Sequence, residues 1–177
     1  MKRNTTSILC SAVRGGIAAM IMVSLLLLSH ATSAQSIEAT EATPHCVQVS
    51  GTLMTNFNVM GENITLGTAT GDLKGAVSAT ILSVTPRAGG VLNFLVLHHW
   101  VTEAGEVIVF DPAQAVASPI APGVFGVTYD QIKVTGGTGK FEGAKGVLTA
   151  FGAADLGRGE TVFRYSGQIC FKAPGKP

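Results

Sequence analysis

The sequence predicts an all-β domain of about eight short strands, arranged as a sandwich or as a closed barrel. Apolar segments rich in β-branched and aromatic residues recur along the chain, and clusters of Gly, Pro, Asn and Asp separate them. No segment between these turns predicts a long helix. Cys46 begins the first predicted strand and Cys170 ends the last. In an antiparallel barrel with an even number of strands these two ends are neighbours, so the cysteines favour the barrel.

The strands follow from alternation and from apolar, β-branched content. The best hairpin joins residues 91–101 and 106–110 across a short turn that contains Gly105. Residues 111–122 are rich in Pro and Ala and are predicted to be irregular, extended at most at their start. The predicted strands cover residues 47–56, 64–71, 76–84, 91–101, 106–110, 126–134, 147–155 and 161–171.

Residues 135–143 are too rich in glycine for a strand or a helix, and they are predicted to form a sharp turn. A phosphate-binding loop is excluded because Lys140 is followed by Phe141 and not by Ser or Thr. A dinucleotide fingerprint is excluded because Glu142 stands where its third glycine is required. We expect Phe141 to lie in the core, and the turn to depend on glycines that accept positive φ. These glycines are Gly136, Gly137, Gly139 and Gly143.

Residues 1–34 are predicted to be a cleavable signal peptide, which makes the protein secreted or periplasmic. Lys2, Arg3 and Arg14 give a positive start, residues 16–28 are apolar, and small residues follow at 31–34. The alternative is a membrane anchor, but a spanning helix needs about 20 apolar residues. Residues 35–45 are predicted to be a linker and residues 46–172 the barrel domain, with no membrane span once the signal is removed.

Removal of residues 1–34 would leave 143 residues, with nine Lys and Arg against eleven Asp and Glu. A slightly acidic domain without a basic stripe is a poor nucleic-acid binder. Cys10 would leave with the signal, so Cys46 and Cys170 would remain as an even pair. In an exported protein such a pair predicts a disulfide, and two free thiols are the alternative.

Three segments resemble the allene oxide cyclase and dirigent proteins. Residues 134–146, VTGGTGKFEGAKG, are similar to their VTGG-x-G-x-F-x-G-A-x-G turn, which leads into a late barrel strand. Residues 70–74, TGDLK, and residues 105–109, GEVIV, are similar to two further segments in the same order. The resemblance implies a calycin-like, eight-stranded antiparallel barrel with a central cavity, in a family that is often trimeric.

The active-site residues of the cyclases and the dirigent proteins match this sequence poorly. The cyclases place a glutamate and an asparagine inside the barrel from their first strand, whereas VQVSGTLMTN at residues 47–56 has no acidic residue. Asn56 and Asn58 are the only amides near the far end of this strand, and the resemblance does not decide between them. The distinctive motifs of the dirigent proteins are absent, so catalytic residues stay unassigned and an isomerase-like or cyclase-like activity stays open.

His98, His99 and Trp100 form the most unusual local feature. Neighbouring residues of a strand point to opposite faces, so His98 and Trp100 share one face and only one histidine can enter a cavity. This geometry disfavours a metal site, and no cofactor is predicted. Tyr129 lies near a strand end, where polar groups gather at a barrel mouth. A packed strand histidine beside a core Trp100 is the simpler interpretation of the same residues.

The favoured function is a barrel that binds a small apolar or aromatic molecule and steers its cyclisation or coupling by confinement. The ligand-binding candidates are Asn56, His98, His99, Trp100 and Tyr129. The alternative is a non-enzymatic structural or interaction protein with a filled barrel that uses its outer face to form oligomers. The size of the inward side chains separates the two functions.

Overall fold

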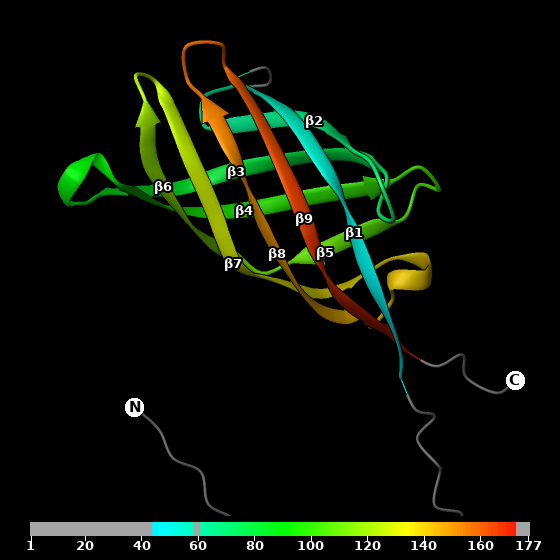
Figure 1. Cartoon of the computed structure of the whole chain (residues 1–177). Helices are drawn as coiled ribbons and strands as arrows, with labels where there is room; N and C mark the ends of the chain where they lie inside the picture. The colour runs from blue at the N-terminus through cyan, green and yellow to red at the C-terminus, as the bar shows by residue number, and fades with distance from the viewer. Residues whose placement is uncertain (1–43, 59–60, 173–177) are drawn as a thin grey trace, which may run out of the picture. The chain divides into compact units, whose positions relative to one another are not determined.

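The structure is a computed structural model, and it describes residues 44–58 and 61–172. The predicted signal peptide and residues 35–43 of the predicted linker lie outside the described residues. Nine strands and two short 3-10 helices make up the described part of the chain (Figure 1). They are β1 (His45–Phe57), β2 (Ile64–Ala69), β3 (Gly75–Pro86), η1 (Ala88–Gly90), β4 (Leu92–Thr102), β5 (Val107–Phe110), β6 (Ala113–Ala121), β7 (Val124–Gly137), η2 (Gly139–Phe141), β8 (Lys145–Asp155) and β9 (Glu160–Phe171).

The strands close into an antiparallel barrel with eight positions. The order is β1, β2, β3, β4, then a position that β5 and β6 share, then β7, β8 and β9, which pairs again with β1. β5 pairs with β4 and β7 toward one end of the barrel, and β6 pairs with the same two strands toward the other. The predicted eight-stranded antiparallel barrel is therefore confirmed, and the sandwich is not formed.

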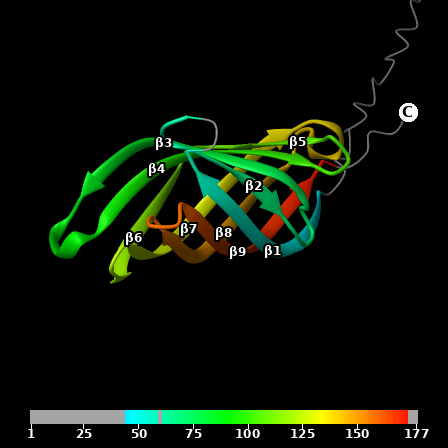
Figure 2. The ribbon, with the colours of Figure 1, turned by 90° about the horizontal axis from the view of Figure 1, so that it is seen from above.

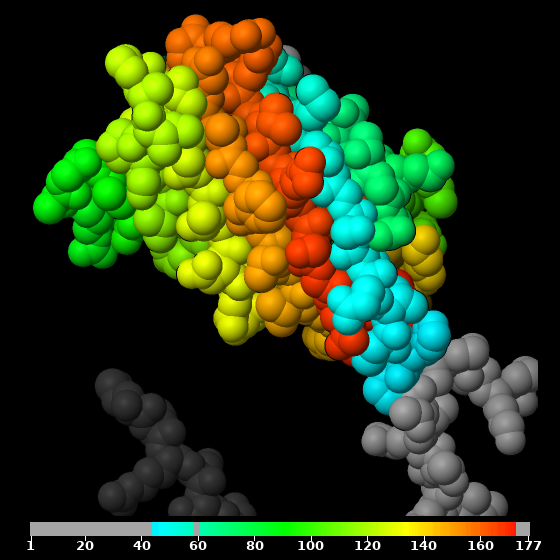
Figure 3. All heavy atoms as spheres, in the orientation of Figure 1, coloured from blue at the N-terminus to red at the C-terminus, as the bar shows by residue number. Residues whose placement is uncertain are grey.

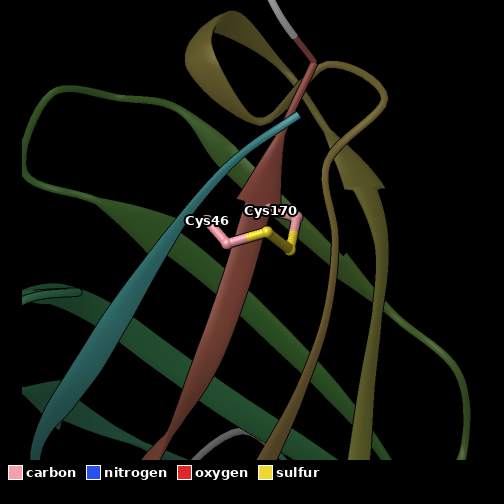
Figure 4. The surroundings of a disulfide bond; sticks show 2 residues. All are labelled: Cys46 and Cys170. Atoms are coloured by element: carbon pink, nitrogen blue, oxygen red, sulfur yellow. A yellow bond between two sulfur atoms is a disulfide. The ribbon is translucent and has the colours of Figure 1, made fainter. Parts of the chain in front are cut away.

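The first and last strands meet at the disulfide. Cys46 on β1 lies directly opposite Cys170 on β9 in the strand register, and a disulfide joins them (Figure 4). The pairing of β1 with β9 runs from His45 opposite Phe171 to Asn56 opposite Glu160. The predicted bridge is confirmed, and it fastens the two strands that close the barrel.

Two local predictions need correction. Residues 111–122 were predicted to be irregular, but they contain β6. Alanine and proline have a low propensity for strands, and the hydrogen bonds that β6 forms with β4 and β7 outweigh it. Residues 135–143 were predicted to hold no strand or helix, but β7 continues to Gly137 and η2 follows. Gly137 allows β7 to approach β5 closely, since a Cβ there would meet the carbonyl oxygen of Val107.

One end of the barrel, called here the filled end, is packed solid. Phe141, Ile108, Leu148 and Ile169 have less than 2 % of their surface exposed. The ring of Phe141 lies 5.5 Å from that of Phe171, between centroids. These buried side chains form the tightly packed core of the barrel at this end.

A small hydrogen-bond network holds the loop between β2 and β3 against this core. The Tyr165 hydroxyl donates to the carbonyl oxygen of Thr70 at 2.9 Å and accepts from the backbone N–H of Leu73 at 3.0 Å. The indole Nε1 of Trp100 donates to the carbonyl oxygen of Leu73 at 2.6 Å. Both aromatic side chains are thereby fixed, and Trp100 forms the floor of the space above them.

The opposite end, called here the open end, carries a long hairpin. β3 extends past its pairing with β2 to η1 at the hairpin tip, and β4 returns from the tip paired with β3 and with β6 (Figures 1 and 2). A β-bulge between Ile81 and Ser83 bends this extension. Within residues 44–58 and 61–172, no helix has the length and apolar character that a membrane crossing requires.

Candidate ligand-binding cavity

The open end of the barrel is hollow. A cavity of about 530 Å³ lies above Trp100 and reaches the surface beside Val84 and Leu156, which are both exposed. This volume falls in the range of sites that bind small organic molecules. The interior is therefore neither filled nor empty throughout: one end is a packed core and the other is a pocket.

Small side chains on two strands leave this volume free. Ala115 and Ala117 on β6 and Ala150 and Ala154 on β8 all border the cavity, and each is at most 6 % exposed. Their methyl groups occupy positions where a larger residue would fill the barrel. Aromatic side chains from the other strands line part of the remaining wall, namely Phe57, Phe94, Phe125, Phe163, Tyr129, His98 and Trp100.

His98 contributes a buried polar group to this wall. Its ring meets the ring of Tyr129 at 5.3 Å and that of Phe110 at 6.1 Å between centroids, both edge to face. Its Nδ1 is buried and has no hydrogen-bond partner among the described residues. Burial, and to a smaller extent the neighbouring His99, lowers the pKa of His98 from 6.5 to about 4. The imidazole is therefore neutral at physiological pH.

Tyr129 is the second polar ring of the wall. It lies between His98 and Phe163, whose centroid is 5.8 Å from its own. Burial raises the pKa of the Tyr129 phenol from 10.0 to about 12, because the ionised form would lose its hydration. Both titratable rings that the cavity contacts most closely are thus uncharged between about pH 5 and pH 11.

Three threonines add hydroxyl groups that sequence reasoning missed. The hydroxyls of Thr55 and Thr161 lie 2.7 Å apart across the β1–β9 pair, and both residues border the cavity. Thr65 on β2 borders it as well and is 6 % exposed. Their inward position follows from strand alternation, because Thr55 is two residues from Leu53 and from Phe57. The strands were predicted one by one, so the register between them, which brings these threonines to the cavity, was not predicted.

The predicted site residues do not all meet at the cavity. His98, Trp100 and Tyr129 border it together, and Trp100 is 4 % exposed at its floor. His99 borders the wall but is exposed, and it stands opposite Val109 in the β4–β5 register. Asn56 is exposed on β1 and does not border the cavity. The turn residue Phe141 is fully buried at the filled end, away from the cavity.

The cavity wall carries no formal charge in the described part of the chain. None of the described residues that border it is Asp, Glu, Lys or Arg. Arg158 and Glu160, in the β8–β9 hairpin, pair with each other at 3.2 Å and remain exposed. Among residues 44–58 and 61–172, no three His, Cys, Asp or Glu side chains converge as a metal site would require.

Fold and site together define an eight-stranded antiparallel barrel with an apolar, aromatic cavity at one end. No protein-family model matches the sequence, and no curated protein matches it. One similar solved structure is that of the pterocarpan synthase dirigent protein GePTS1. It has 15% sequence identity and a TM-score of 0.33, over 77% of this chain and 90% of that chain.

Proposed function

We propose that this protein is an exported barrel that binds one small, largely apolar molecule in the cavity at its open end. The observation that carries the proposal is the contrast within the barrel interior. Large side chains pack the filled end, whereas alanines on β6 and β8 leave about 530 Å³ free beneath an aromatic wall. An internal volume of this size costs stability when it contains nothing, since its lining loses packing contacts.

The disulfide supports the exported part of the proposal. Disulfides persist in oxidising compartments and are rare in the reducing cytosol. The bridge between Cys46 and Cys170 joins the two closing strands of the barrel. A periplasmic or extracellular protein with this bridge would keep the barrel closed around its ligand.

Confinement is also the activity that this site could supply to a reactive ligand. A cavity that holds a molecule in one conformation favours one course of its reaction without an acid or a base. The inward residues of β1 near the cavity are Leu53, Thr55 and Phe57, none of which is a carboxylate. We therefore place ligand binding first and the steering of a cyclisation or coupling second.

The test uses N-phenyl-1-naphthylamine, an uncharged probe that fluoresces in apolar surroundings and accepts energy from tryptophan. Trp100 is the single tryptophan of the chain and lies at the cavity floor, so it reports occupancy directly. We expect saturable binding with one site per chain. Ala115→Phe places a ring inside the cavity and should weaken binding at least about tenfold, because a filled site excludes the probe.

The control is Phe151→Ser. Phe151 lies on β8 and is 59% exposed. Figure 3 shows the outer surface along which β8, β9 and β1 lie side by side. This variant should bind the probe as the unaltered protein does. Equal binding by Ala115→Phe, or loss of binding in Phe151→Ser, would place the probe on the outer surface and overturn the proposal.

A further inference from the structure

We propose that the ligand of this cavity is uncharged and presents a hydrogen-bonding group to His98. The inference rests on the proposed function and goes further, because it names the chemical class that the site selects. It is based on the residues that line the cavity and on the surroundings of the His98 imidazole.

The wall offers nothing that would compensate a charge. The described residues that border the cavity include no Asp, Glu, Lys or Arg, and the titratable groups near His98 are His99 and Tyr129. An ion that left water for this wall would lose its hydration without gaining a partner of opposite sign. A carboxylate or a sulfonate group is therefore excluded from the deep part of the cavity.

His98 carries the one fully buried side-chain nitrogen or oxygen that lacks a hydrogen-bond partner among the described residues. Its Nδ1 is buried without a partner, against the aromatic rings of Phe110 and Tyr129. A neutral imidazole carries one N–H donor and one lone-pair acceptor. A half-turn about the Cβ–Cγ bond exchanges Nδ1 with a ring carbon, so this nitrogen can be turned away from its present surroundings toward a ligand. A ligand with a hydroxyl, amine or carbonyl group at this depth would satisfy it.

The threonine hydroxyls are less in need of a ligand. Thr55 and Thr161 already bond to each other at 2.7 Å. A hydrocarbon can therefore leave this pair undisturbed, but it cannot complete the hydrogen bonding of His98. The site should discriminate against pure hydrocarbons as well as against ions, because a buried polar group without a partner is costly.

Three probes of one skeleton separate these effects at pH 7.5. N-phenyl-1-naphthylamine is neutral and has one N–H group. 8-Anilinonaphthalene-1-sulfonate adds a negative charge, and 1-benzylnaphthalene replaces the N–H by a methylene. The amine should bind at least about tenfold more tightly than the sulfonate, because the anion is desolvated without compensation. It should bind about fivefold more tightly than the hydrocarbon, which is the worth of one typical hydrogen bond.

Replacement of His98 tests the role of the imidazole. The affinity of His98→Phe for the amine should fall to its affinity for the hydrocarbon. Its affinity for the hydrocarbon should stay the same or rise. His98→Leu serves as a second variant in case the larger ring disturbs the packing, and the same loss of preference is expected. Phe151→Ser is the control for sulfonate bound to the outer face, because its side chain is exposed and does not border the cavity.

The outcomes distinguish the two proposals. If none of the three probes binds, the proposed function fails. If the hydrocarbon binds but amine and sulfonate bind equally well, ligand binding stands and the uncharged class is wrong. If His98→Phe leaves the preference for the amine over the hydrocarbon unchanged, His98 is not the group that the ligand meets, and the inference is overturned.

Discussion

His98 links the stability of the barrel to pH. Its pKa is about 4 in the folded chain and 6.5 as the ordinary value, so the unfolded chain binds the proton more readily between these limits. The free energy of unfolding should therefore fall as pH drops through this range. The expected loss through His98 is about 2 kcal/mol between pH 7.5 and pH 5.

Urea denaturation of the unaltered protein and of His98→Phe at both pH values measures this loss. The variant should lack the His98 part of the decrease. Acid-sensitive contacts elsewhere remain in both proteins and cancel in the comparison. One such contact is that of Glu106, whose pKa is lowered chiefly by the backbone N–H of Lys140. Identical pH dependence in the two proteins would show that His98 is not buried in its neutral form.

The sequence predicted the direction of side chains correctly where the alternation along a single strand determines it. Alternation along residues 98–100 placed His98 and Trp100 on one face and His99 on the other, as the structure has them. It could not find Thr55, Thr65 and Thr161, because their meeting depends on the register between strands. Asn56 was predicted to be a ligand-binding residue only because it carries an amide. Its position in the alternation of β1 turns its side chain outward.

The decisive elements are β6 and β8, because their alanines determine which part of the barrel is hollow. β6 was missed in the sequence, since alanine and proline are poor strand formers and its pairing comes from β4 and β7. The split of one barrel position between β5 and β6 was missed for the same reason. The other eight strands were predicted, with shifts of a few residues at their ends.

Two alanine substitutions test the division between hollow and filled elements. Ala115→Phe on β6 enters the cavity and should change the free energy of unfolding by less than about 1 kcal/mol, because space for the ring exists. Ala144 is 0% exposed at the filled end and does not border the cavity. Ala144→Phe should destabilise the protein by about 1–3 kcal/mol or more through overpacking.

Chemical denaturation of the two variants under identical conditions provides the comparison. The free energy of unfolding of Ala144→Phe should be clearly lower than that of Ala115→Phe. The value for Ala115→Phe should be close to that of the unaltered protein. A large loss of stability in Ala115→Phe with none in Ala144→Phe would reverse the assignment of the two ends.

At the scale of the whole molecule, the disulfide closes a loop that contains nearly the entire barrel. Cys46 and Cys170 are 124 residues apart in the sequence. The chain-entropy account then assigns the bridge about 4–5 kcal/mol, because a long loop restricts the unfolded chain strongly. The double variant Cys46→Ser, Cys170→Ser should lose about this much stability in urea denaturation. A difference below about 1 kcal/mol would show that closure by β1–β9 pairing alone is sufficient.

The barrel could be predicted from the sequence because its strands, turns and cysteines are local features. The cavity could not, since it depends on the sizes of side chains that meet across the interior from different strands. The trimer and the cyclase-like activity implied by the resemblance stay predictions.

The central claim is that one molecule binds inside the open end, and its most direct test is an NMR titration of protein labelled at the alanine methyl groups. N-phenyl-1-naphthylamine is the titrant. The methyl signals of Ala115, Ala117 and Ala154 should shift and saturate at one equivalent, because all three border the cavity. The signal of Ala144, at the filled end, should stay unchanged. Saturation with shifts confined to Ala153, which does not border the cavity, or no shift at Ala115 despite binding, would contradict a ligand site inside the barrel.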